Sequence, residues 1–133
     1  MKTIELQTRH KEEFIDIAAE IQEAVRASKI ECGICLVYVP HTTAGLTINE
    51  HADPDVTTDI LMALKRLVPD SFSWNHSEGN APAHVKSSLI GSSVQIIVEG
   101  GRLALGTWQG IFFCEFDGPR RRRVYIKIVS SEH

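Results

Sequence analysis

The last third of the chain contains four short strand-like segments and no helical pattern, and this run limits the available folds most. The segments cover residues 94–99, 102–105, 111–116 and 124–129. Gly100-Gly101 and Asp117-Gly118-Pro119 supply the turn residues between them. A chain that ends in a run of strands, rather than alternating strands with helices, belongs to the α+β class.

The earlier part of the chain supplies the helices and further strands. Apolar residues recur at helical spacing in residues 11–28, and Asp53-Pro54 begins a second helix that stops before Pro69. A short third helix is expected over residues 83–90, where Gly91 ends it. The remaining strands are expected at residues 3–8, 32–39 and 46–48. We therefore predict an α+β protein with two to three helices, in which residues 1–133 form a single domain.

Composition supports a folded chain outside the membrane. Of the 133 residues, 43% are hydrophobic, which is enough to build a core. No apolar run approaches the ~20 residues of a membrane span, and the start lacks an apolar export signal. The three cysteines are expected as thiols, and Cys32 and Cys35 as strand residues rather than a redox pair. We expect a cytoplasmic protein that does not bind membranes.

The net charge of −3 is unevenly distributed. Residues 120–133 contain five of the 14 basic residues and one of the 17 acidic ones, so the rest of the chain is acidic. An acidic body argues against nucleic-acid binding, which needs a broad basic face. The run Arg120 to Arg123 has two interpretations: protection of a strand edge, or a clamp for phosphate.

Three segments concentrate polar side chains. The first contains His41 at the end of a buried strand, and the second contains His76 and His84 around a long loop. If the three histidines converge, they leave an open coordination position of the kind found in catalytic zinc sites. The alternative is that His41 makes only a hydrogen bond in a turn.

The third segment is Gly106-Thr107-Trp108-Gln109-Gly110. Trp108 either packs in the core or forms a stacking wall for a planar ring. Backbone N–H groups around Gly106 could hold an anion.

Together the three segments resemble the YjbQ-like family, also called the secondary thiamine-phosphate synthase family. The resemblance covers nearly the whole chain. The matching motifs are His41-Thr42-Thr43-Ala44-Gly45-Leu46-Thr47-Ile48-Asn49-Glu50, Asp53-Pro54, Asp59, His76, Glu78-Gly79-Asn80, His84-Val85-Lys86-Ser87-Ser88, Gly106-Thr107-Trp108-Gln109-Gly110-Ile111, Glu115 and Gly118-Pro119-Arg120-Arg121-Arg122.

The resemblance implies a β-sandwich or barrel-like sheet of mixed or antiparallel strands, assembled as a homotrimer with a pocket near a subunit boundary. It also implies a divalent metal, zinc or alternatively magnesium, held by His41, His76 and His84. Some family members show a weak thiamine phosphate synthase activity, so the resemblance implies a metal-assisted transferase reaction on a small phosphorylated or heterocyclic substrate.

Candidate roles follow from this reaction, which needs charge neutralisation at a leaving diphosphate and two rings held in line. The catalytic candidates are His41, Glu50 and His84. The substrate-binding candidates are Thr42, Thr43, Asn49, Asn80, Trp108, Gln109, Arg120 and Arg122. A non-catalytic protein that binds a metal and a phosphorylated metabolite would use the same residues, so this second hypothesis stays open. Under both hypotheses the partner is a small phosphorylated metabolite.

Overall fold

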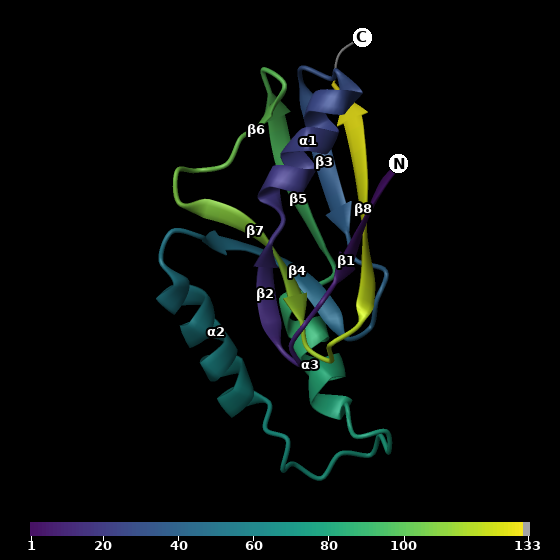
Figure 1. Cartoon of the computed structure of the whole chain (residues 1–133), viewed down its shortest axis with the longest axis vertical. Helices are drawn as coiled ribbons and strands as arrows, with labels where there is room; N and C mark the ends of the chain where they lie inside the picture. The colour runs from purple at the N-terminus through teal and green to yellow at the C-terminus, as the bar shows by residue number, and fades with distance from the viewer. Residues whose placement is uncertain (132–133) are drawn as a thin grey trace.

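Two antiparallel sheets form the body of the computed structural model, which describes residues 1–131 (Figure 1). The strands are β1 (Lys2–Gln7), β2 (Glu13–Asp16), β3 (Gly33–Tyr38), β4 (Ala44–Glu50), β5 (Ser93–Glu99), β6 (Arg102–Leu103), β7 (Gln109–Glu115) and β8 (Arg121–Ser130). One sheet has the order β1-β8-β3-β5-β6, and the other has the order β2-β7-β4. The pairs within each sheet are antiparallel.

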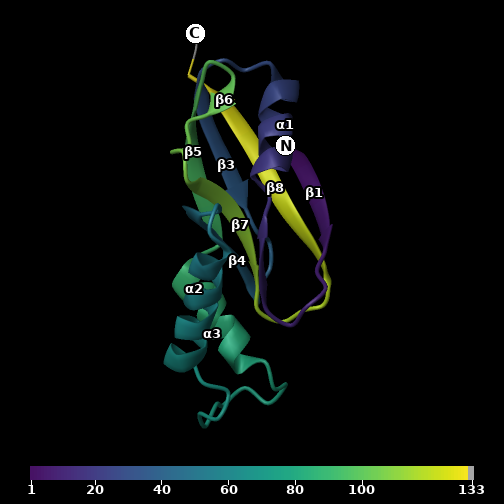
Figure 2. The same cartoon turned by 60° about the vertical axis from the view of Figure 1, so that its left-hand side comes forward.

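The helices within residues 1–131 are α1 (Ala18–Ser28), α2 (Pro54–Leu67) and α3 (Ala81–Ile90). Helix α2 begins as expected, because the Asp53 side chain accepts a hydrogen bond from the Asp55 N–H at 2.9 Å and Pro54 occupies the first turn. Helix α1 lies at one end of the molecule, whereas α2 and α3 lie together at the other end (Figures 1 and 2).

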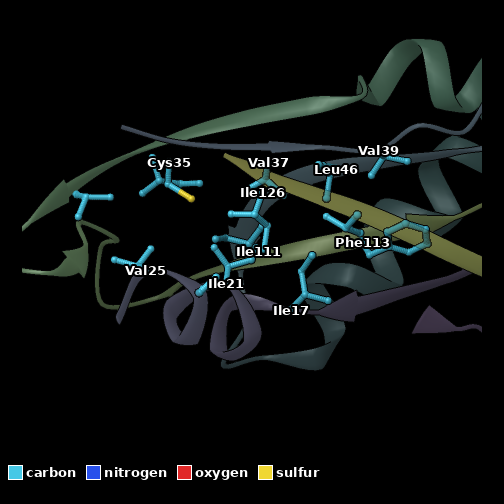
Figure 3. Close-up of a cluster of buried hydrophobic side chains, with 14 of the residues drawn as sticks. Ile17, Ile21, Val25, Cys35, Val37, Val39, Leu46, Ile111, Phe113 and Ile126 are labelled. Atoms are coloured by element: carbon cyan, nitrogen blue, oxygen red, sulfur yellow. The ribbon is translucent and has the colours of Figure 1, made fainter. Parts of the chain in front are cut away.

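The main core lies where α1 meets the inner faces of both sheets (Figure 3). Ile21 and Val25 of α1 pack with Val37 of β3 and Phe113 of β7. Cys35 belongs to the same cluster, and burial raises the pKa of its thiol to about 11. A buried thiol with a raised pKa stays protonated at neutral pH and packs as a small apolar group.

A second, smaller core lies on the other face of β7. Phe112 and Cys114 alternate with the residues of the main core and pack with Phe116, with Leu64 of α2 and with Ala83 of α3. Strand β7 is therefore buried on both faces, and it fixes α2 and α3 against the three-stranded sheet.

The helix predicted over residues 11–28 begins later than expected, because Glu13–Asp16 forms β2 beside β7. The Glu13 carboxylate accepts hydrogen bonds from the N–H groups of Arg9 and His10, at 2.7 and 2.9 Å. A short run of apolar residues is compatible with either a helix or a strand, and pairing with a neighbouring strand decides which of the two forms.

The prediction of strand-edge protection by the arginine run is wrong. Strand β8, which carries Arg121 to Arg123, lies between β1 and β3 and is not an edge strand. The three side chains alternate, so only Arg122 of these three points into the protein.

The predicted class is confirmed: the fold is α+β, with curled antiparallel sheets of the barrel-like kind expected. Within residues 1–131 no helix is long and apolar enough to cross a membrane.

Candidate functional site

A cleft of ≈ 610 Å³ opens where the β3–β4 connection meets the start of α3 and the β7–β8 turn. Seven residues predicted from the sequence lie in its wall: His41, Thr42, Thr43, Asn80, His84, Arg120 and Arg122. The other lining residues are Tyr38, Pro40, Glu78 and Asp117. The fold therefore brings together residues of the first two polar segments and of the arginine run, whereas no residue of the segment 106–110 lines the cleft.

Arg122 forms the rigid part of the cleft wall. Its side chain is 4% exposed and pairs with Glu115, which is fully buried. The guanidinium Nε donates to Glu115 Oε1 at 2.8 Å, and Nη2 donates to Glu115 Oε2 and to Thr43 Oγ1, the latter at 2.9 Å. These bonds hold the guanidinium in one orientation. The Nη1 group has no acceptor within residues 1–131, so its N–H donors remain available for a ligand.

His41 is held in one tautomer by its neighbour in β8. Its Nε2 accepts a hydrogen bond from the backbone N–H of Arg123 at 2.8 Å, so a neutral ring carries its proton on Nδ1. Partial burial lowers the pKa of His41, and the positive charge of Arg122 lowers it further, against a smaller opposing effect of Glu115. At neutral pH the ring is therefore an uncharged donor.

Arg120 is fixed at the cleft edge through Asp117. Its Nη2 donates to Asp117 Oδ2 at 2.9 Å, and its Nε donates to the Asp117 carbonyl at 2.8 Å. Asn80 Nδ2 donates to the same carboxylate oxygen at 2.9 Å. Burial acts to raise the pKa of Asp117, but the hydrogen bonds from Asn80 and Arg120 outweigh it and hold that pKa below its usual value.

The three predicted metal ligands do not form one set. His76 and His84 lie edge to face, with ring centroids 5.1 Å apart, and His76 Nε2 lies 3.6 Å from Glu78 Oε2. His41 lines the same cleft as His84, but it does not complete a metal-binding group with the other two histidines in the described residues. Within residues 1–131 no group of three or more His, Cys, Asp or Glu side chains is arranged to hold a metal ion.

Four predicted site residues lie at the opposite end of the β4–β7 pair: Asn49, Glu50, Trp108 and Gln109. In the strand register Glu50 faces Gln109, whereas Ala44, next to Thr43, faces Glu115. Six residue steps along a strand correspond to about 20 Å. Glu50 therefore cannot act together with His41 and His84 within one copy of the chain.

The far end has its own local structure. The Gln109 Oε1 atom accepts the Gly106 N–H at 2.8 Å, and the backbone carbonyl of Trp108 accepts the His51 N–H at 2.9 Å. The Trp108 side chain is 63% exposed, so it is not a core residue. The loop is therefore held by hydrogen bonds, and it exposes the aromatic ring of Trp108 to solvent.

Two residues that organise the cleft carry no sequence signal for this role. Asp117 belongs to a predicted turn, but in the structure it also orients Asn80 and Arg120. Thr8 has no motif around it, yet its Oγ1 donates to Glu115 Oε1 at 2.7 Å and accepts the Arg120 N–H at 2.8 Å. No local pattern marks such a residue, because its partners are more than 100 positions away.

Similar proteins occur in archaea and bacteria. The UPF0047 protein MJ1081 of Methanocaldococcus jannaschii is 52% identical over 96% of this chain and 93% of its own length. The UPF0047 protein YugU of Bacillus subtilis is 51% identical over 97% of this chain and 98% of its own length.

The expectation of metal-assisted thiamine phosphate synthesis is wrong. The names of these relatives record no activity, and a YbjQ-like protein of Sulfolobus solfataricus with a solved structure is described as of unknown function. The three-histidine metal group that the reaction needed is not formed in the described residues. The expectation of zinc or magnesium as a cofactor remains an untested prediction.

Solved structures share the fold closely. A crystal structure of a YjbQ/UPF0047 protein of Clostridium acetobutylicum is 53% identical, covers 97% of this chain and 100% of that one, and has a TM-score of 0.95. The Sulfolobus structure is 36% identical, covers 98% of this chain and 96% of that one, and has a TM-score of 0.94. The family model described as UPF0047 protein YjbQ-like matches residues 2–131, and the chain therefore belongs to the YjbQ-like UPF0047 family.

Proposed function

We propose that the protein binds a small phosphate-bearing metabolite in the cleft around His41 and Arg122. The observation that carries this proposal is the Arg122 guanidinium, which is buried, is locked by Glu115 and belongs to a residue of the cleft wall, and whose Nη1 group makes no hydrogen bond within residues 1–131. A fixed guanidinium loses little side-chain entropy when it binds, and its planar donors match phosphate oxygens.

The other donors in the wall support the same ligand. His41 presents its Nδ1–H, and Thr42 adds a hydroxyl. Arg120 is half exposed at the cleft edge, where Asp117 holds its orientation. Each arginine contacts a carboxylate with one side of its guanidinium, and the remaining N–H groups can only donate. The cleft wall therefore favours a ligand with several acceptor oxygens over a bulky cation.

Titration calorimetry with inorganic phosphate and ribose 5-phosphate tests the proposal. Arg120→Ala should weaken binding about tenfold, because it removes a charged donor from the cleft. Arg120→Lys should recover only part of the loss, since lysine cannot bind two oxygens through a planar fork. The matched control is Arg102→Ala at an exposed position of β6, which should bind as the unmodified protein does.

If the Arg120→Ala variant and the unmodified protein bind the two ligands with equal affinity, the proposal is refuted. It is also refuted if the unmodified protein binds neither inorganic phosphate nor ribose 5-phosphate.

We further propose that the protein acts as a homotrimer, in the cytoplasm. The supporting observation is an apolar patch on the outer face of the five-stranded sheet: Ile34 faces Ile97 and Val129 across two strand pairs, and all three are exposed. Light scattering at micromolar concentration should give three times the monomer mass. A stable monomer would contradict the assembly.

A further inference from the structure

A second hollow lies beside the cleft and is not used by the phosphate site. It is a smaller cavity of ≈ 160 Å³ between the start of α3, the segment before β2 and the β7–β8 turn. Glu12, Lys86, Asn80 and Asp117 are among its lining residues. Asn80 and Asp117 also line the cleft, so the two spaces adjoin at these two residues.

Lys86 gives this cavity a buried charge. Its side chain is 4% exposed, and its Nζ donates to Glu12 Oε2 at 2.6 Å. A lysine ammonium has three N–H groups, and the bond to Glu12 accounts for one of them. Burial of an ammonium is unfavourable unless its remaining donors also find acceptors. The cavity therefore contains donors that need acceptor atoms.

Asn80 lines the same cavity and contains a buried acceptor that has no donor. Its Nδ2 donates to Asp117, which fixes the amide orientation because a carboxylate can only accept. The other amide atom, Oδ1, is buried and receives no hydrogen bond within residues 1–131. A buried polar atom without a partner is rare in folded proteins and indicates a position where a bound group completes the bonding.

The two unsatisfied groups differ in what they require. Lys86 must donate, and Asn80 Oδ1 must accept. A phosphate dianion can only accept, and an ammonium can only donate, whereas a hydroxyl group does both. A cavity of ≈ 160 Å³ has room for a short chain of hydroxyl-bearing carbons.

We infer that this cavity is a hydroxyl-binding subsite, and that the ligand of the neighbouring cleft is a polyol phosphate such as a phosphorylated sugar. The inference rests on the proposed phosphate site. The phosphate binds at His41, Arg120 and Arg122, and the hydroxylated part of the molecule extends beside Asn80 and Asp117 toward Lys86.

The test compares two phosphate esters of equal chain length in titration calorimetry, glycerol 3-phosphate and propyl phosphate. The unmodified protein should bind glycerol 3-phosphate about tenfold more tightly or better, because propyl phosphate leaves both buried groups unpaired. This comparison needs no variant, so it holds even where a substitution in the cavity prevents folding.

Variants then locate the preference. The double variant Glu12→Gln with Lys86→Met removes both charges and the spare N–H donors of residue 86, and it should lower the affinity ratio of the two esters several-fold, because only Asn80 Oδ1 then favours a hydroxyl. The matched control is Lys2→Met at an exposed position of β1, which should keep the tenfold ratio.

The outcomes separate the two proposals. Equal binding of both esters by the unmodified protein means that only water fills the cavity, which overturns the subsite and leaves the phosphate site standing. Binding of neither ester overturns both. A tenfold preference that the double variant retains also overturns the assignment to Lys86.

Discussion

The two ends of the β4–β7 strand pair differ in how their polar residues are held. At the cleft end, Glu115 and Arg122 are buried and joined by several hydrogen bonds. At the other end, Trp108 is exposed, and the contact between His51 Nδ1 and Asp16 Oδ2 is long, at 3.3 Å, and open to solvent.

This difference indicates which end of the strand pair can bind a ligand through groups of fixed geometry within one copy of the chain. Buried side chains that are joined by hydrogen bonds keep their positions before a ligand arrives, so binding costs little ordering. Exposed side chains such as Trp108 make few contacts within the chain and are better suited to contact with another molecule. The four predictions below test whether the two ends differ as strongly in energy as they do in structure.

The largest effect is expected for Arg122→Gln. This change leaves the Glu115 carboxylate buried without its charged partner, which should lower the free energy of unfolding by about 3–5 kcal/mol. Urea denaturation measures the loss. The double variant with Glu115→Gln should recover part of the stability, because no unpaired charge remains. A single variant as stable as the unmodified protein would remove the basis for a locked cleft.

A smaller loss is expected for Thr8→Val, a change that keeps the shape of a fully buried side chain. It removes the hydrogen bond to Glu115 and the acceptor for the Arg120 N–H. The free energy of unfolding should fall by about 1–3 kcal/mol. Thr58→Val on the exposed surface of α2 serves as the control and should change stability by about 0.5 kcal/mol or less. Equal effects of the two changes would contradict the importance of the buried network.

The pH dependence of the free energy of unfolding reports the contribution of His41 protonation. Because its pKa is lowered in the folded state, the unfolded chain takes up a proton at higher pH than the folded chain does. The free energy of unfolding should therefore fall as the pH drops from the ordinary value of 6.5 through the lower folded pKa, and this contribution should stay constant above 6.5.

The variant His41→Gln keeps an acceptor for the Arg123 N–H but cannot titrate. Urea denaturation at a series of pH values should show a shallower loss for this variant below pH 6.5 than for the unmodified protein. Parallel curves would show that His41 is not perturbed in the folded state.

The smallest effect is expected for Trp108→Ala at the far end. An exposed side chain contributes little to folding, so stability should change by about 0.5 kcal/mol or less. Phosphate affinity should stay within about twofold, since the strand register places this residue about 20 Å from the cleft. A tenfold loss of phosphate affinity would instead indicate that Trp108 of one copy lies at the cleft of a second copy, because it is too far from its own cleft.

The local elements were largely predictable because their signals are local. Asp53 and Pro54 begin α2 through the capping contact expected from sequence, and the alternation of exposed and buried residues in β8 follows the two-residue period of strands. The exception is β2, where the residues satisfy a helical pattern and the backbone partners in β7 decide the outcome.

The candidate site was predictable only in part. The sequence by itself determined the α+β class, the polar segment at His41 and the arginine run, because turn residues, hydrophobic period and charge depend on neighbours along the chain. Only the tertiary structure decided that Arg122 turns inward to Glu115, that the three histidines form no metal-binding group within residues 1–131, and that Trp108 lies at the far end. These outcomes depend on strand register and on hydrogen bonds between residues distant in sequence, which no local pattern encodes.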